Sequence, residues 1–148
     1  MTVIAVGADH AGFLLKTTVV EHLRALGHDV VDLGTDSDAR VDYPDFGAAV
    51  GRTVADGTAE AGVCVCGSGI GIAMAAGKVP GIRAATVHDV TSARLAREHN
   101  DANVICIGAR FLGEQTALDA VDAYLAADFE GGRHQGRVQK IDQLDERP

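Results

Sequence analysis

Residues 66–71, with the sequence CGSGIG, place a thiol directly before a run in which glycine occupies every second position. The glycines let the backbone approach a ligand closely, and amides ahead of a helix can hold negative charge. They would also stabilise a thiolate at Cys66, which could act as a nucleophile or as a base. The alternative is a tight turn with no ligand, beside a cysteine that packs as a small apolar residue. We adopt the thiol-site interpretation for Cys66 and the packing interpretation for Cys64 and Cys106.

Histidines and basic residues elsewhere in the chain could support such a site. His10 follows the first apolar run, and loop residues at the edge of a sheet are common ligand contacts. His99 ends a helical pattern, where a cationic imidazole also has a purely structural use beside the helix C-terminus. Arg133, Arg137 and Lys140 follow at helical spacings of four and three. Such a row is usually a solvated face, although arginines at this spacing can also grip a phosphate.

Five short apolar runs indicate the strands that must position these residues. They span residues 3–7, 29–34, 61–67, 82–87 and 103–108. Helical patterns separate them, so the sequence predicts an α/β fold, a three-layer α/β/α sandwich around a five-stranded, parallel, Rossmann-like sheet. In such sheets ligands bind beyond the carboxyl ends of the strands. The residues expected at that edge are Asp9, His10, Asp42, Tyr43, residues 66–71, His88, Asp89 and Arg110.

Helix boundaries also follow from the sequence. The first helical pattern carries an apolar face that ends at Leu26, just before Gly27, and glycine suits the position after a helix. Pro44 suits the first turn of a second helix, and Asp89 suits the cap of a later one.

Length, charge and cysteine content exclude several classes of protein. The 148 residues have the length of one domain, and no repeat or linker divides them. A formal net charge of -8 argues against nucleic acid or an anionic membrane as a partner. The sequence has no run of about 18 apolar residues and no basic signal-peptide flank, so we expect a cytoplasmic protein. Three cysteines without a second pair predict neither a disulfide framework nor a metal site.

Seven blocks of the sequence resemble ribose-5-phosphate isomerase type B, in a wider family that includes allose-6-phosphate and galactose-6-phosphate isomerases. The blocks are GADHAGF (7–13), DYPDF (42–46), CGSGIGIAMAAGK (66–78), GIRAA (81–85), REHNDANV (97–104), GAR (108–110) and EGGRHQGRV (130–138). They span nearly the whole chain in the family's order. The resemblance implies an aldose–ketose isomerase that works through a cis-enediolate, without a metal or an organic cofactor.

The resemblance also implies roles in the chemistry. Cys66 would be the base that moves a proton between C2 and C1, and the Ser68 hydroxyl would help to move protons between O1 and O2. His99 would be the acid that opens the sugar ring. A subgroup of the family has a glutamate base at position 72, and Ile72 excludes that mechanism here. The residues that would bind the developing oxyanion are Gly67, Ser68, Gly69, Ile70 and Gly71.

Other residues would hold the substrate, again by resemblance. Residues 131–148 would form a C-terminal arm that crosses to a dimer partner, with the glycines at 131 and 132 as its hinge. We therefore expect a homodimer, or a tetramer of dimers, with sites shared between subunits. Asp9, His10 and Asn100 would contact sugar hydroxyls or the phosphate end, Arg110, Arg133 and Arg137 would bind phosphate, and His134 and Tyr43 would line the same pocket.

Three alternatives stay open at this point. A thiol-dependent acyl or phosphoryl transferase would use a similar cysteine but would form a covalent adduct with its substrate. A sugar-phosphate-binding module on the same fold would need the arginines but neither Cys66 nor His99. An isomerase of a four- or six-carbon phosphate would differ only in the far end of its pocket. Ribose 5-phosphate is our first choice, because the matching blocks look most like that branch.

Overall fold

The computed structural model describes residues 2–146, in which five strands form one parallel sheet of order β2-β1-β3-β5-β4. The strands are β1 (Val3–Ala8), β2 (Asp29–Asp32), β3 (Ala61–Cys66), β4 (Ala84–Thr86) and β5 (Val104–Gly108). Each lies within one residue of, or inside, an apolar run seen in the sequence. The predicted parallel sheet is therefore confirmed.

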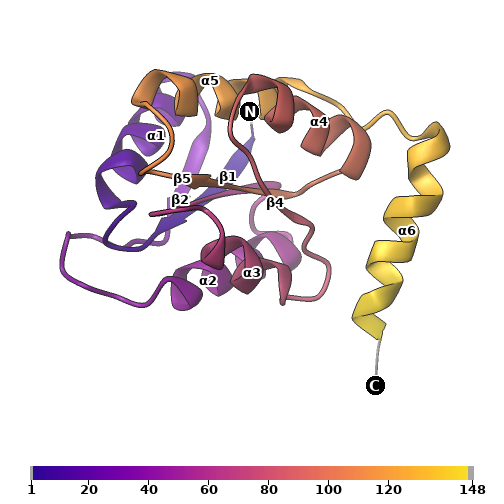
Figure 1. Ribbon diagram of the computed structural model, residues 1–148, viewed down its shortest axis with the longest axis horizontal. Coiled ribbons are helices and arrows are strands. Elements are labelled where there is room, and N and C mark those ends of the chain that lie inside the picture. Colours follow the sequence, from indigo (N-terminus) through magenta and orange to yellow (C-terminus); the bar gives the residue numbers. More distant parts are fainter. Residues whose placement is uncertain (1, 147–148) are drawn as a thin grey trace.

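Helices cover both faces of this sheet, as Figure 1 shows. One layer contains α1 (Phe13–Ala25), α4 (Val90–Asn100) and α5 (Glu114–Ala126), and the other contains α2 (Tyr43–Ala55) and α3 (Gly71–Gly77). Because parallel strands need crossover connections, each helix runs back against its strands. The three-layer α/β/α arrangement predicted from the alternating pattern is confirmed.

The alternation of side chains along β3 divides the core into two parts. Val63 and Val65 pack against the layer of α1, α4 and α5, whereas Cys64 and Cys66 point to the layer of α2 and α3. Cys106 on β5 lies directly beside Cys64. A hydrogen bond with Cys64, together with complete burial, raises the pKa of the Cys106 thiol well above its usual range. Cys64 and Cys106 are thus core residues, as the sequence suggested.

The helix ends follow the residues expected to form them, with one exception. Pro44 lies in the first turn of α2, and Asp89 caps α4 by accepting a hydrogen bond from the Ser92 amide at 2.6 Å. Gly27 has a φ of +91° just after α1, as a residue beyond a helix end requires. Leu26 does not continue the buried face of α1, because it follows the last turn and is 56% exposed.

The C-terminal segment stands outside the three layers, beside the β4 edge (Figure 1). A 3-10 turn (Gly132–His134) leads into α6 (Gln135–Gln143), and a second 3-10 turn (Leu144–Glu146) follows it. Asp142 of α6 pairs with Arg83 at 2.9 Å, and Asp145 accepts a hydrogen bond from the Gly81 amide at 2.7 Å. Positive φ angles at residues 131 and 132 turn the chain into this segment. Among the described residues, no helix has the length and apolar character needed to cross a membrane.

Candidate functional site

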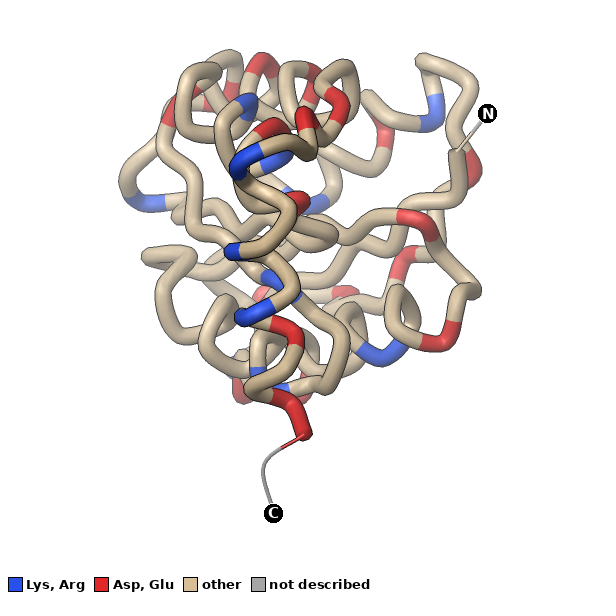
Figure 2. Tube along the Cα trace, turned by 90° about the vertical axis from the view of Figure 1, so that its right-hand side faces the viewer, with Lys and Arg blue, Asp and Glu red and all other residues tan. Residues whose placement is uncertain are grey.

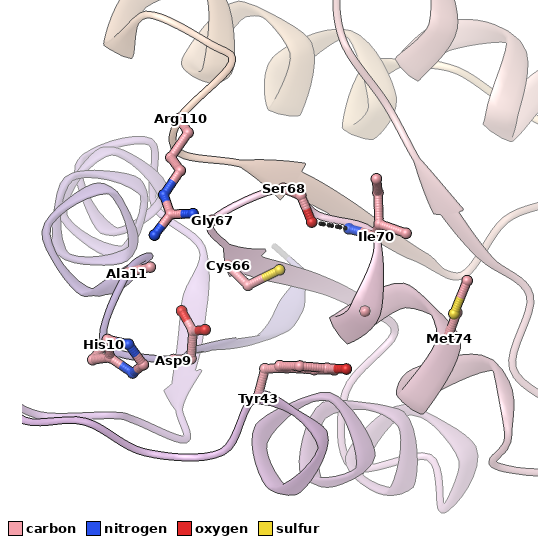
Figure 3. Close-up of a pocket in the computed structure, with 11 residues that line it drawn as sticks. Asp9, His10, Ala11, Tyr43, Cys66, Gly67, Ser68, Ile70, Met74 and Arg110 are labelled. Atoms are coloured by element: carbon pink, nitrogen blue, oxygen red, sulfur yellow. Dashed lines mark hydrogen bonds between the residues drawn. The ribbon is translucent and has the colours of Figure 1, made fainter.

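A pocket of about 440 Å³ opens at the carboxyl edge of the sheet, between the ends of β1 and β3. The connections from these two strands lead to opposite layers, and this is where doubly wound sheets bind ligands. Figure 3 shows the side chains that surround it. The lining residues are Asp9, His10, Ala11, Tyr43, Cys66, Gly67, Ser68, Ile70, Gly71, Met74 and Arg110.

The loop that follows β3 wraps around the Cys66 thiol. The Gly69 amide donates a hydrogen bond to Cys66 Sγ at 3.1 Å, so a backbone group of the loop fixes the position of the sulfur atom. Gly69 has a φ of +74°, a conformation that costs glycine little. Its carbonyl accepts a hydrogen bond from Thr86 Oγ1 at 2.7 Å, so the loop is held to β4 on its far side.

The Ser68 hydroxyl is oriented by the same loop. Its oxygen accepts a hydrogen bond from the Ile70 amide at 3.1 Å, as the dashed line in Figure 3 marks. A hydroxyl that accepts from the backbone keeps its own proton free to donate elsewhere. The amides of Gly69 and Ile70 therefore both donate hydrogen bonds to side chains of the loop itself.

Glycine at two positions of the loop makes room for side chains from other elements. A β-carbon on Gly71 would lie 2.5 Å from the Tyr43 ring, so this ring at the start of α2 packs directly on the loop. A β-carbon on Gly67 would lie 3.3 Å from the Arg110 guanidinium, which comes from the turn after β5. The loop thus holds an aromatic ring and a permanent cation at the pocket wall.

Asp9 brings a buried carboxyl group to the pocket, with only 6% of the residue exposed. One of its oxygens accepts a hydrogen bond from the Gly12 amide at 3.0 Å. In Figure 3 the carboxyl group points toward the space between Cys66 and Arg110. A fixed acceptor there can bind a sugar hydroxyl.

Five residues expected at the substrate lie away from this pocket in the described part of the chain: His99, Asn100, Arg133, His134 and Arg137. His99 and Asn100 end α4 just before β5 begins, whereas Cys66 ends β3. Because β3 and β5 are parallel neighbours, the two ends of the strands lie at opposite edges of the sheet. The structure therefore separates the expected acid from the expected base within one chain.

His99 and His134 form a stacked pair at the amino edge of the sheet. Their ring centroids are 4.2 Å apart and the ring planes differ by 15°. Glu130 lies 3.5 Å from His99 Nε2. Burial lowers the pKa of His134, and the positive charges of His99 and Arg133 lower it further. Among the described residues the His134 Nε2 atom is buried without a hydrogen-bond partner.

The same three side chains are the described residues closest to a metal-binding arrangement. One ligand atom each from His99, Glu130 and His134 lies within 4.8 Å of the others. Imidazole binds a metal through a lone pair in the plane of its ring. In nearly parallel, stacked rings these lone pairs do not converge on one point. The pair suits hydrogen bonding to an anion or a hydroxyl group better than metal coordination.

Basic residues lie along the C-terminal arm, and Figure 2 shows those of α6. Arg137 and Lys140 are exposed on α6, and Arg133 is exposed in the preceding 3-10 turn rather than in the helix. Within residues 2–146 neither arginine forms an ion pair with a carboxylate. The arm therefore offers unpaired positive charge in an acidic protein.

Four residues near these sites were not singled out from the sequence. Ala11 and Met74 line the pocket, Thr86 holds the Gly69 carbonyl, and Glu130 contacts His99. Met74 lies one helical turn after Ile70, so the pocket's helical periodicity could have indicated it. Thr86 and Glu130 gave no signal, because their contacts depend on how strands and the arm come together.

The fold and pocket define a class, a doubly wound α/β domain with a thiol and a glycine-rich loop at its carboxyl edge. The chain belongs to the ribose/galactose isomerase family, whose model matches residues 4–141. It is accordingly a sugar-phosphate isomerase of the aldose–ketose type.

Individual relatives match almost the whole chain. The chain is 46% identical to ribose-5-phosphate isomerase B of Escherichia coli over 147 residues, or 99% of each chain. It is 42% identical to a D-erythrulose-4-phosphate isomerase of Pectobacterium atrosepticum, over 95% of this chain and 93% of that one. The crystal structure of ribose-5-phosphate isomerase B from Mycoplasma genitalium with bound ribulose-5-phosphate matches with a TM-score of 0.94 and 42% identity. That match covers 99% of this chain and 97% of the other.

Proposed function

We propose that this protein interconverts ribose 5-phosphate and ribulose 5-phosphate by proton transfer through a cis-enediolate. The observation that carries the proposal is the Cys66 thiol, which lies in the pocket with the Gly69 amide at 3.1 Å. The Asp9 carboxylate and the Arg110 cation line the same pocket. A related isomerase of the same fold binds ribulose-5-phosphate, which supports a five-carbon substrate.

Cys66 acts in this proposal as the base. Its thiolate takes the C2 proton of the open-chain aldose, the C2–H electron pair forms the C1–C2 double bond of the enediolate, and negative charge moves to O1. The thiol then returns the proton to C1, which gives the ketose. Ser68, whose hydroxyl proton is free to donate, moves protons between O1 and O2. Amides of the loop stabilise the charged oxygen.

A second chain completes the site in this proposal. His99 is the acid for ring opening, yet it lies at the opposite edge of the sheet from Cys66 in the same chain. A dimer in which the C-terminal arms cross would bring His99, Asn100 and His134 of one subunit to the partner's pocket. Arg133 and Arg137 would then bind the phosphate together with Arg110 of that pocket. The homodimer is the smallest assembly with complete sites.

Erythrose-type four-carbon phosphates form the second candidate substrate class. The relative named D-erythrulose-4-phosphate isomerase favours this alternative, because it is nearly as similar to the chain as the ribose enzymes are. Loss of one carbon unit costs only about 1–3 kcal/mol where that unit merely fills an apolar part of a pocket, so neighbouring chain lengths can be accepted there.

Proton NMR of ribose 5-phosphate in D2O tests the function directly. The wild-type protein is expected to produce ribulose 5-phosphate with deuterium at the transferred position. Cys66→Ser should slow this about 10³-fold, because a serine hydroxyl is a much weaker base. Cys64→Ala, a change at a buried thiol of the same strand, is the matched control and should keep turnover.

Other results would replace the proposal. Conversion of a four-carbon aldose phosphate at a kcat/KM far above that of ribose 5-phosphate would change the substrate. A covalent adduct on Cys66 in the mass spectrum, without solvent exchange at C2, would indicate a transferase. Failure to convert four-, five- and six-carbon phosphates would indicate a binding module.

A further inference from the structure

We infer that His10 acts as a hydrogen-bond donor through Nε2, and that the backbone of Val41 sets this role. The inference rests on the proposed function for the identity of the substrate, but its geometric basis does not. Cys66 and His10 both line the pocket, and a neutral imidazole is the stronger candidate for a base in many sites. The state of the His10 ring therefore decides which group can take the C2 proton.

His10 is anchored on one side only. Its Nδ1 atom lies 3.1 Å from the Val41 amide nitrogen and 3.2 Å from the Val41 carbonyl oxygen. Val41 belongs to the segment between β2 and α2, which passes beside the pocket just before Tyr43. Within residues 2–146 no group forms a hydrogen bond with Nε2. Figure 3 shows the ring beside Asp9 at one end of the pocket.

The Val41 amide decides the neutral tautomer. An amide N–H is a permanent donor, so it can bond to Nδ1 only when that nitrogen carries a lone pair. A proton on Nδ1 would face the amide hydrogen and leave the half-buried Val41 N–H without its partner. Unpaired backbone N–H groups are rarer in proteins than under-used carbonyl groups. The neutral ring is therefore protonated on Nε2.

The cationic ring gives the same result at Nε2. When both nitrogens are protonated, Nδ1 can donate to the Val41 carbonyl at 3.2 Å, and the Val41 N–H then loses its acceptor. Val41 thus provides a partner for Nδ1 in either charge state. In both states Nε2 carries a proton and can only donate.

Two consequences follow for the pocket. His10 cannot accept the C2 proton through Nε2, so it does not compete with Cys66 as the base of the proposed reaction. His10 instead presents a donor to an oxygen of the substrate, whereas the Asp9 carboxylate beside it presents an acceptor. Val41 is a positioning residue that acts through its main chain and not through its side chain.

A long-range ¹H–¹⁵N spectrum of the ¹⁵N-labelled protein at pH 7.5 tests the tautomer in the absence of substrate. We expect the His10 Nδ1 resonance in the range of an unprotonated nitrogen and Nε2 in the range of a protonated one. Either His10→Asn or His10→Gln assigns the signals by their loss. His28 is an internal comparison, because its Nδ1 has no partner in the described residues. A His10 ring protonated on Nδ1 alone would overturn the inference.

Kinetics of the two variants test the role. A glutamine amide can place an N–H near the position of Nε2, whereas the shorter asparagine amide reaches only the position of Nδ1. His10→Gln is therefore expected to keep the KM for ribose 5-phosphate about tenfold closer to the wild-type value than His10→Asn does. Equal KM values for the two variants would overturn the donor role. A chain that does not isomerise sugars would fail the proposed function, while the NMR result would still decide the tautomer.

Discussion

The pocket at the carboxyl edge and the histidine pair at the amino edge differ in what each one contains. The pocket holds Cys66, a loop of amides and a single nearby arginine, Arg110. The pair holds two imidazoles beside an arm that carries two unpaired arginines. In the proposed function, one region moves a proton at carbon, and the other protonates an oxygen and binds phosphate. Neither has the full set that an isomerase of a cyclic sugar phosphate requires.

In the proposed function this difference means that the histidine pair and the arm of one chain serve the pocket of another subunit. Side chains that serve their own pocket are held by neighbours in the fold, as Tyr43 is by Gly71. Within residues 2–146 the side chains of the exposed arginines on the arm form neither an ion pair nor a hydrogen bond. The buried, unpartnered Nε2 of His134 points to the same conclusion for the histidine pair. A two-fold dimer would place each half against its complement.

The largest expected effect is the recovery of isomerase activity in a heterodimer of two inactive variants. Cys66→Ser and His99→Gln homodimers should each lose about 10³-fold in kcat for ribose 5-phosphate, because each lacks a proton-transfer group. A heterodimer with one chain of each kind, purified through two different tags, has one intact site if sites are shared. It should recover about half of the wild-type turnover. Activity no higher than that of the homodimers, or full activity of a monomer in sedimentation, would contradict shared sites.

The next largest effect is an increase in KM when an arginine of the arm is removed. Arg137→Ala should raise the KM for ribose 5-phosphate about 10- to 100-fold with little change in kcat, because the phosphate is bound equally in ground and transition states. Arg52→Ala changes an exposed arginine of α2 and is the matched control. Initial rates over a range of substrate concentrations separate the two constants. A fall in kcat at constant KM would assign Arg137 a different role.

The smallest expected effect is the pH dependence of folding stability that arises from His134. Since its folded-state pKa is lowered, the unfolded chain binds more protons near the usual histidine value of about 6.5. Folding stability should therefore fall as the pH drops from about 7.5 through this value toward the folded pKa. Urea unfolding at fixed protein concentration measures the loss, and His134→Gln should reduce it. An NMR titration midpoint of His134 above the usual value would contradict the assignment.

Most of the fold could be predicted from the sequence because strands and helices alternate with clear apolar periods. The pocket residues at Asp9, Tyr43, Cys66 and Arg110 followed from the rule that ligands bind beyond the carboxyl ends of parallel strands. The place of His99 did not follow from the residues. A resemblance gives a side chain its role, but the direction of α4 determines at which edge that side chain lies. Leu26 shows a smaller limit of prediction from the sequence. The apolar period of α1 continues to Leu26, but the helix itself ends one residue earlier.

The shortest strand of the sheet, β4, connects the two regions described above. Thr86 at its end holds the Gly69 carbonyl of the thiol loop at 2.7 Å. Arg83, just before its start, donates to the Asn100 and Asp101 carbonyls and pairs with Asp142 of the arm. An edge strand of three residues is among the first parts of a sheet to open in local unfolding. Each such opening would loosen the loop beside Cys66 and the end of α4 beside His99 in a single event, so order in the two regions would be gained and lost together.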